Sequence, residues 1–153
     1  MAKGEKRAFN SVFCENRRAR HDYAILDTVE CGIVLAGTEV KSVRSGGVSL
    51  SGSYGAVLKG ELWLVGADIA AYEFGNRFNH SPKSMRKLLV HRREIESLRL
   101  KTEAKGLTLV PLKLFLKNGR IKVDLGVCRG KAVHDKREAL KDKAVKRDLE
   151  RYR

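Results

Sequence analysis

The stretch "LVPLKLFLKNGRIKVDLGV", residues 109–127, limits the possible folds of this chain more than any other segment. Asn118-Gly119 is the preferred centre of a two-residue hairpin turn, because both central positions of that turn need positive φ. Such a turn fixes the register of the strands on either side of it. The predicted partners are Lys117 with Arg120, Leu116 with Ile121, Phe115 with Lys122, Leu114 with Val123, and Leu112 with Leu125.

This register sorts the hairpin side chains into two faces. The apolar face, predicted to lie in the core, holds Leu112, Leu114, Leu116, Ile121, Val123 and Leu125. The other face holds Lys113, Phe115, Lys117, Arg120 and Lys122. An exposed aromatic ring among cations suits a nucleic acid, because phosphates contact Lys and Arg while bases or riboses contact the ring. The alternative is an ordinary solvated face on which another element covers Phe115.

The remaining patterns add strands and short helices. Residues 22–37 predict a long first strand, bent or bulged at Gly32. Residues 38–47 predict a short helix capped by Thr38, and residues 53–69 predict two strands joined at Lys59-Gly60. A polar loop follows at 72–84. Residues 85–106 then combine an apolar run with a helix that carries Ile95, Leu98 and Thr102 on one side and ends at Gly106.

Five or six short strands interrupted by one or two helices indicate a small closed or nearly closed barrel. The predicted fold is mainly β with some α: an oligonucleotide-binding-type barrel with a few flanking helices and a C-terminal tail. At 153 residues, the chain is expected to form one barrel body at 1–130 and a separate tail at 131–153.

The charge distribution narrows the class of partner. The chain has 32 Lys and Arg residues against 18 Asp and Glu residues, a net charge of +14. Residues 22–76 are net acidic at −4, so the rest of the chain carries an excess of +18. Such an asymmetry favours repeated contact with phosphates; the alternative is a basic protein that is merely soluble. The basic segments lack a large apolar face, and no apolar run approaches the length of a membrane span, so we expect no membrane binding. The sequence also shows no secretory signal, and we therefore expect a cytoplasmic protein.

Catalytic and metal-binding patterns are missing from the sequence. Its three cysteines are an odd number without a CxxC pair, which predicts reduced, partly buried thiols rather than disulfides or a zinc site. His21 and Asp22 are neighbours and are expected on opposite sides of a strand. The carboxylates of Asp22, Glu30, Glu39 and Asp68 show no metal-ligand spacing. We therefore expect neither an enzyme nor a cofactor.

Six blocks of the sequence together resemble the SmpB family, whose members bind transfer-messenger RNA in bacterial trans-translation. The blocks are "NRRARHDYAI", "GIVLAGTEVKSVRSG", "GNRFNHSP", "RKLLVHRREI", "KGLTLVPLKLFLKNGRIKVDLGV" and "RGKAVHDKRE", in order from about Asn16 onward. The resemblance implies a barrel that grips the elbow of the tRNA-like part of that RNA, as a monomer. The complex would then enter ribosomes stalled on messages without a stop codon, where the nascent chain is tagged and released. The alternative is another ribosomal or rRNA-binding protein built on a similar barrel.

The resemblance also assigns residues to the RNA surface. The family's RNA-facing positions match Asn16, Arg17, Glu30, Leu89 and Lys122. Arg17 and Lys122 offer charge to phosphates, and Leu89 can pack on an unstacked base. Glu30 can only accept hydrogen bonds, so it is expected to confer specificity more than affinity. The chain departs from the family pattern at Ser81, which replaces an acid, and at Cys31, which replaces a residue that is more often Ala.

The last 23 residues are predicted to be disordered in the free protein, because their two short apolar stripes do not align and their i,i+4 ion pairs are weak. They are expected to become helical against ribosomal RNA. The resemblance implies that this tail occupies the decoding centre and the empty message channel of the small subunit. The matching tail residues are Gly130, Lys131, His134, Asp135, Lys136 and Arg137. His21 and Tyr23 match a surface expected near the decoding nucleotides.

Overall fold

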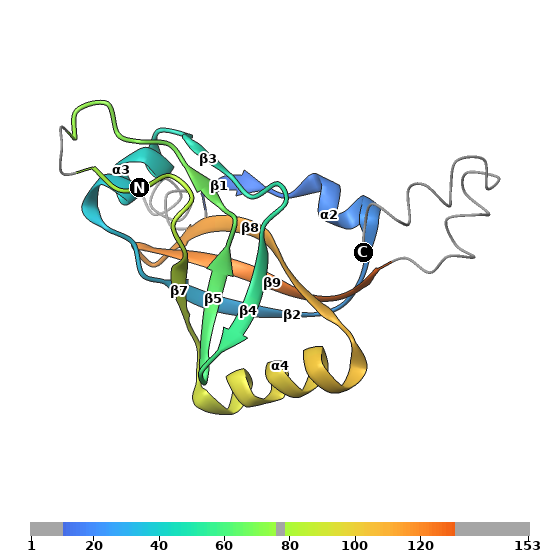
Figure 1. The fold of residues 1–153 in the computed structure, drawn as a ribbon. Coiled ribbons are helices and arrows are strands. Elements are labelled where there is room, and N and C mark those ends of the chain that lie inside the picture. Colours follow the sequence, from blue (N-terminus) through green and yellow to red (C-terminus); the bar gives the residue numbers. More distant parts are fainter. Residues whose placement is uncertain (1–10, 76–78, 131–153) are drawn as a thin grey trace.

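The computed structural model describes residues 11–75 and 79–130. A seven-stranded sheet runs in the order β1-β8-β4-β5-β7-β2-β9, and β9 pairs again with β8, which closes the sheet into a barrel (Figure 1). The strands are β1 (Val12–Glu15), β2 (Tyr23–Ile33), β4 (Tyr54–Leu58), β5 (Glu61–Val65), β7 (Arg86–Leu89), β8 (Thr108–Lys117) and β9 (Arg120–Gly130). The predicted mainly β barrel with flanking helices is confirmed.

The predicted hairpin forms, with one correction. Asn118 and Gly119 have φ values of 53° and 79°, and the four register pairs nearest the turn are those predicted. Leu112 does not face Leu125, because the register shifts so that Pro111 pairs with Leu125. Proline has no N–H to donate to a ladder and therefore favours a bulge. The bulge moves Leu112 into a second, smaller cluster with Ala19, Val110 and Cys128.

The long strand β2 is also irregular, but not at the predicted place. Its register against β9 shifts between Ile25 and Asp27, whereas Gly32 pairs regularly with Lys122. Gly32 also pairs with Leu89 of β7, and a Cβ on Gly32 would lie 3.3 Å from the Leu89 Cβ. The glycine is therefore explained by close packing between β2 and β7 rather than by a bend.

Three helices flank the barrel in the described part of the chain: α2 (Arg17–Asp22), α3 (Gly37–Arg44) and α4 (Arg92–Lys105). The predicted cap of α3 was wrong. Ala36 occupies the N-cap position, and Glu39 Oε1 accepts a hydrogen bond from the Ala36 N–H at 2.7 Å. The α4 prediction is confirmed, including its end at Gly106 with φ 65°.

Several shorter elements complete the structure. The Lys59-Gly60 turn between β4 and β5 is confirmed, with φ values of 52° and 77°. A two-stranded sheet pairs β3 (Val48–Ser49) with β6 (Asp68–Ile69). The sequence pattern missed β1 and α2, because both precede the first long apolar run and are too short to show a clear period.

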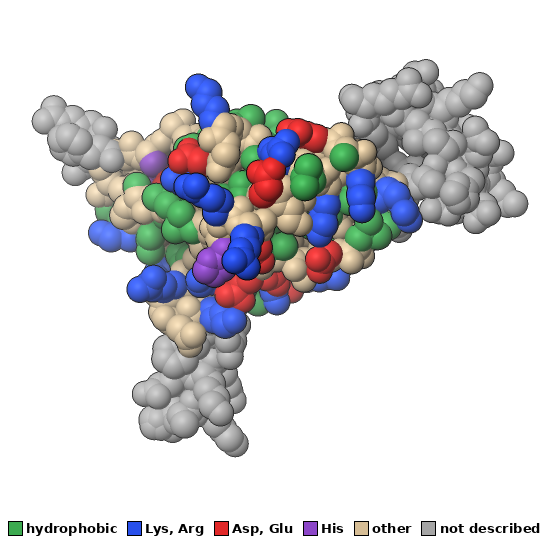
Figure 2. Space-filling view, turned by 90° about the horizontal axis from the view of Figure 1, so that it is seen from below, with side chains coloured by type: hydrophobic (Ala, Val, Ile, Leu, Met, Phe, Trp, Pro, Cys, Tyr) green, Lys and Arg blue, Asp and Glu red, His purple; other side chains and the backbone are tan. Residues whose placement is uncertain are grey.

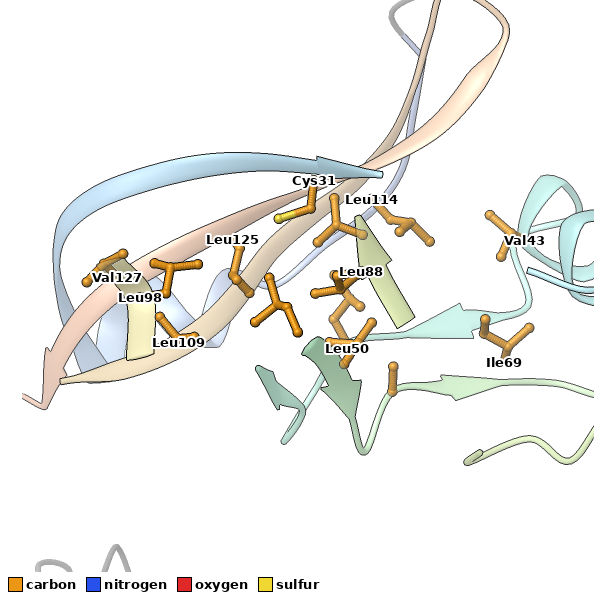
Figure 3. Packing of buried hydrophobic residues seen from close by; sticks show 14 residues of the cluster. Cys31, Val43, Leu50, Ile69, Leu88, Leu98, Leu109, Leu114, Leu125 and Val127 are labelled. Atoms are coloured by element: carbon orange, nitrogen blue, oxygen red, sulfur yellow. The ribbon is translucent and has the colours of Figure 1, made fainter. Parts of the chain in front are cut away.

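The main core fills the barrel, and α4 covers one end of the barrel (Figure 1). Figure 3 shows how apolar side chains from strands far apart in the sequence meet Leu98 of α4. Cys31 lies in this core and is fully buried, and Cys128 is buried in the smaller cluster. Burial raises the pKa of Cys31 to about 12 and that of Cys128 to about 11, so both thiols stay protonated at neutral pH. All three cysteines are free, as predicted.

Candidate nucleic-acid interface

A groove lies where the end of β2, the end of β7, α3 and the tip of the β8–β9 hairpin meet. We call it the cationic groove; its volume is about 490 Å³. Its lining residues are Gly32, Ile33, Leu35, Val40, Arg44, Leu89, Gly119, Arg120, Ile121 and Lys122. Three of these carry positive charge and none carries negative charge, so the groove can neutralise phosphates without repelling them.

The groove is built on one row of cross-strand partners. The row runs from Phe115 through Lys122 and Gly32 to Leu89, across β8, β9, β2 and β7. Because Gly32 has no side chain, the Leu89 side chain can pack closely over it, next to Lys122 in the same row. Leu89 is 49% exposed, which leaves its side chain available for contact. The groove thus offers apolar surface to a base or ribose beside cations for the phosphates.

A buried ion pair holds the α3 wall of the groove. Arg86 Nε of β7 lies 2.7 Å from Glu39 Oε2 of α3, and the exposed fractions of the two side chains are 2% and 7%. The other guanidinium nitrogens of Arg86 donate to the backbone oxygens of Ala67, Ser81 and Pro82. Each of the three guanidinium nitrogens of this buried cation therefore has a partner within the protein. Ser81 takes part through its carbonyl, a contact that does not depend on its side chain.

Glu30 lies outside the groove, in a neighbouring depression that we call the outer depression. Its lining residues are Val12, Glu30, Lys113, Phe115, Lys117 and Asp124. Of the two alternatives for Phe115, the structure confirms the covered ring and not the exposed one, since Phe115 is only 9% exposed. Val12 of β1 stands opposite it, and Lys113 Nζ lies 5.2 Å from its ring centroid. Phe115 is covered because β1 adds a strand beside β8 that the sequence pattern did not reveal.

Asn16 and Arg17, the other two residues assigned to RNA, lie at the start of α2 and do not line the groove. Asn16 is 8% exposed and caps α2, with Oδ1 accepting from the Ala19 N–H at 3.2 Å. Its amide nitrogen donates to the Pro111 oxygen at 3.0 Å. Arg17, by contrast, has a side chain that is 92% exposed. RNA contact by Asn16 stays a prediction, and its amide already has structural partners.

The residues assigned to the decoding surface gather at the other end of β2. Tyr23 begins β2 and pairs with Gly130, the last described residue of β9. His21, in the last turn of α2, has a side chain that is 86% exposed. Its Nδ1 lies 3.0 Å from Asp22 Oδ1, so the expectation that these two neighbours point apart was wrong: they sit on a helix, not on a strand. Lys131, His134, Asp135, Lys136 and Arg137 lie outside the described residues.

The face that carries α4 has a different character. Figure 2 shows it with basic and acidic side chains interspersed. Arg99 contacts both Glu96 and Glu103, and Lys101 Nζ lies 3.9 Å from Asp27. A face with paired charges of both signs does not favour the binding of a polyanion. The cationic groove is therefore the better candidate for the nucleic-acid interface. Arg44 of that groove was missed, although a basic residue in the last turn of a predicted short helix was a signal that could have indicated it.

Metal ligands do not cluster: among residues 11–75 and 79–130, no group of three or more His, Cys, Asp or Glu side chains could hold a metal ion. No helix in the same part of the chain is long and apolar enough to span a membrane.

A closed barrel of the oligonucleotide-binding type with an outer cationic groove defines a class of small nucleic-acid-binding proteins. Within that class, the chain belongs to the SmpB family, whose model, described as SmpB protein, matches residues 13–153. The SsrA-binding protein of Staphylococcus haemolyticus (strain JCSC1435) is 55% identical over 151 residues, which cover 99% of this chain and 96% of that protein.

Two further relatives agree. The SsrA-binding protein of Staphylococcus aureus (strain JH1) is 56% identical over 146 residues, which cover 95% of each chain. A solved structure described as "tmRNA-SmpB: a journey to the center of the bacterial ribosome" contains a chain that is 54% identical, with a TM-score of 0.65. That match covers 77% of this chain and 83% of the other. Family and fold resemblance therefore rest on most of the chain.

Proposed function

We propose that this cytoplasmic protein binds the tRNA-like domain of transfer-messenger RNA and delivers it to stalled ribosomes for trans-translation. It acts as a monomer and as a binding protein, not as an enzyme. The observation that carries the proposal is the cationic groove, in which Leu89 and Lys122 flank Gly32 in one register row of a chain belonging to the SmpB family. The names of its relatives, SsrA-binding protein, and the tmRNA and ribosome named for the related structure support the same partners.

The chemistry of the groove suits the elbow of a folded RNA. An unstacked base or ribose packs on Leu89, while Lys122, Arg120 and Arg44 contact the phosphates around it. Unpaired elbow loops expose such bases, whereas a regular RNA duplex keeps them stacked. The apolar contact therefore selects loop geometry, and the cations supply affinity that depends on salt.

The tail supplies the second half of the function. We propose that residues 131–153, which lie outside the described residues, are disordered in the free protein. On the ribosome they become helical in the decoding centre and the empty message channel, through Lys131, His134, Asp135, Lys136 and Arg137. The pairing of Gly130 with Tyr23 supports a surface that the tail shares with Tyr23 and His21. It places the end of β9, from which the tail continues, next to Tyr23, and His21 is only two residues from Tyr23 in the sequence. A message already in the channel would exclude the tail, so the complex would act on vacant channels.

The first test compares RNA partners. The full-length chain is titrated with the tRNA-like domain, an ordinary tRNA and fragments of ribosomal RNA over a range of salt concentrations. We expect preferential binding to the tRNA-like domain with a marked salt dependence. Preferential binding to ribosomal RNA fragments would instead favour the alternative, a ribosomal protein on a similar barrel.

The second test separates the two parts of the chain. A variant lacking residues 131–153 is expected to keep its affinity for the tRNA-like domain and to lose peptide tagging on stalled ribosomes. Binding is measured with the isolated RNA, and tagging is measured in a reconstituted translation reaction. A large loss of RNA affinity would contradict this division of roles.

A further inference from the structure

We propose that the turn formed by Tyr72 and Phe74 is a second RNA contact, a stacking platform for one unpaired base, separate from the cationic groove. This inference rests on the proposed function, since it assigns the base to the same RNA. Phe74 is 71% exposed, and no other large apolar side chain in the described part of the chain is as exposed. The face of this ring is therefore accessible to a ligand.

The turn holds Phe74 outward by a dense set of bonds. The Asn79 amide nitrogen donates to the Tyr72 oxygen at 2.5 Å, and Asn79 Oδ1 accepts from the Tyr72 N–H at 3.0 Å. The Gly75 N–H also donates to the Tyr72 oxygen. A Cβ on Gly75 would lie 2.7 Å from Asn79 Nδ2, so the turn has no room for a larger residue. The exposure of Phe74 is thus a built feature of a tightly packed turn.

His80 attaches this turn to the rest of the protein. One ring nitrogen of His80 lies 2.8 Å from Thr38 Oγ1 of α3, and the other lies 2.9 Å from the Ile69 oxygen of β6. In Figure 1, the segment after β6 accordingly lies beside α3. A platform anchored on two elements can bind with little loss of conformational freedom.

The chemistry of the turn matches a nucleobase. The Tyr72 and Phe74 rings meet edge to face, with their centroids 5.5 Å apart, and Lys41 Nζ lies 5.6 Å from the Tyr72 ring centroid. Aromatic faces stack on any base, and a neighbouring cation contacts the phosphate beside it. An apolar protein partner would not need this cation, whereas an RNA strand would.

Helix α3 connects the platform to the cationic groove. Lys41 contacts Tyr72 and Arg44 lines the groove, and residues three apart on a helix are neighbours on its surface. An RNA segment whose phosphate lies on Arg44 can therefore continue along α3 and place a base on Phe74. Groove and platform would bind two parts of one RNA.

The test uses the full-length chain and the tRNA-like domain as the probe. Phe74→Ala is expected to weaken binding about tenfold, because one base–aromatic stack is lost, and to leave the slope of affinity against salt unchanged. Leu100→Ala is the matched control: Leu100 is 51% exposed on α4, and its removal should leave affinity unchanged. Thermal unfolding of Phe74→Ala should match that of the wild type, since the ring is mostly exposed.

A fluorescence experiment tests the contact between the platform and the RNA base directly. Trp63 is the sole tryptophan, so Trp63→Phe combined with Phe74→Trp leaves one indole at the platform. We expect this variant to keep wild-type affinity and its fluorescence to be quenched as RNA binds. If Phe74→Ala binds as tightly as the wild type, or if the indole is not quenched, the platform is wrong while the proposed function stands. If the wild type itself does not bind the tRNA-like domain, the proposed function falls and the platform falls with it.

Discussion

Lys117 Nζ of β8 lies 2.9 Å from Glu30 Oε1 of β2, although β9 runs between these two strands. The neighbouring carboxylate, Asp124, stands opposite Glu30 and lies 3.8 Å from Lys113 Nζ. Each acid of the outer depression therefore has a lysine partner from β8. This pairing explains how a carboxylate can lie on a face proposed for RNA: the lysine offsets part of its repulsion from phosphates.

Glu30→Ala is expected to lower discrimination between RNAs. The carboxylate accepts hydrogen bonds from base or ribose donors in the correct RNA, and such a charged bond contributes about 1.5–3 kcal/mol. Removing it should weaken binding to the tRNA-like domain about ten- to 150-fold and leave binding to unrelated RNA unchanged or slightly stronger, since Lys117 is then free of its partner. Competition between the two RNAs measures this ratio. Equal weakening toward all RNAs would contradict the role in specificity.

Lys122→Ala is expected to reduce both affinity and its dependence on salt. If Lys122 neutralises one phosphate, the slope of log affinity against log salt concentration should fall by about one unit. Lys105→Ala, at the end of α4 on the face of mixed charge, is the control and should change neither quantity. An unchanged slope for Lys122→Ala would speak against a phosphate contact.

Glu39→Ala is expected to destabilise the fold by about 3–5 kcal/mol, because it leaves the Arg86 charge buried without its partner. The half-exposed pair of Lys87 and Glu61, 2.9 Å apart, gives the comparison, and Glu61→Ala should cost less than about 1 kcal/mol. Chemical denaturation of the two variants measures the difference. Similar costs for both would mean that burial does not control the strength of these pairs.

Asn16→Ala is expected to destabilise the protein by about 1–2 kcal/mol through the lost cap of α2. Asn16→Asp keeps an oxygen for the cap but loses the donor to Pro111, so its cost should differ from that of Asn16→Ala. Unfolding is measured first, and RNA affinity is then measured under conditions where each variant is folded. A loss of affinity in folded Asn16→Ala, beyond that in Arg17→Ala, would support direct RNA contact.

Local chemistry made several features predictable. The β8–β9 hairpin follows from two adjacent residues that tolerate positive φ, and α4 ends where Gly106 adopts φ 65°. The family blocks pointed to Leu89 and Lys122, which the barrel brings to one groove. For the hairpin and the end of α4, the determining interactions lie within a few residues of one another along the chain.

The sequence by itself therefore determined the turns, the longer strands, the excess of positive charge and the family. Only the tertiary structure decided that Phe115 is covered by β1, that Leu112 leaves the main core at the Pro111 bulge, and that Arg44 joins the groove. The physical reason is that barrel closure brings together segments that are distant along the chain. The burial of a side chain then depends on which strand or helix lands beside it, and no local pattern records that neighbour.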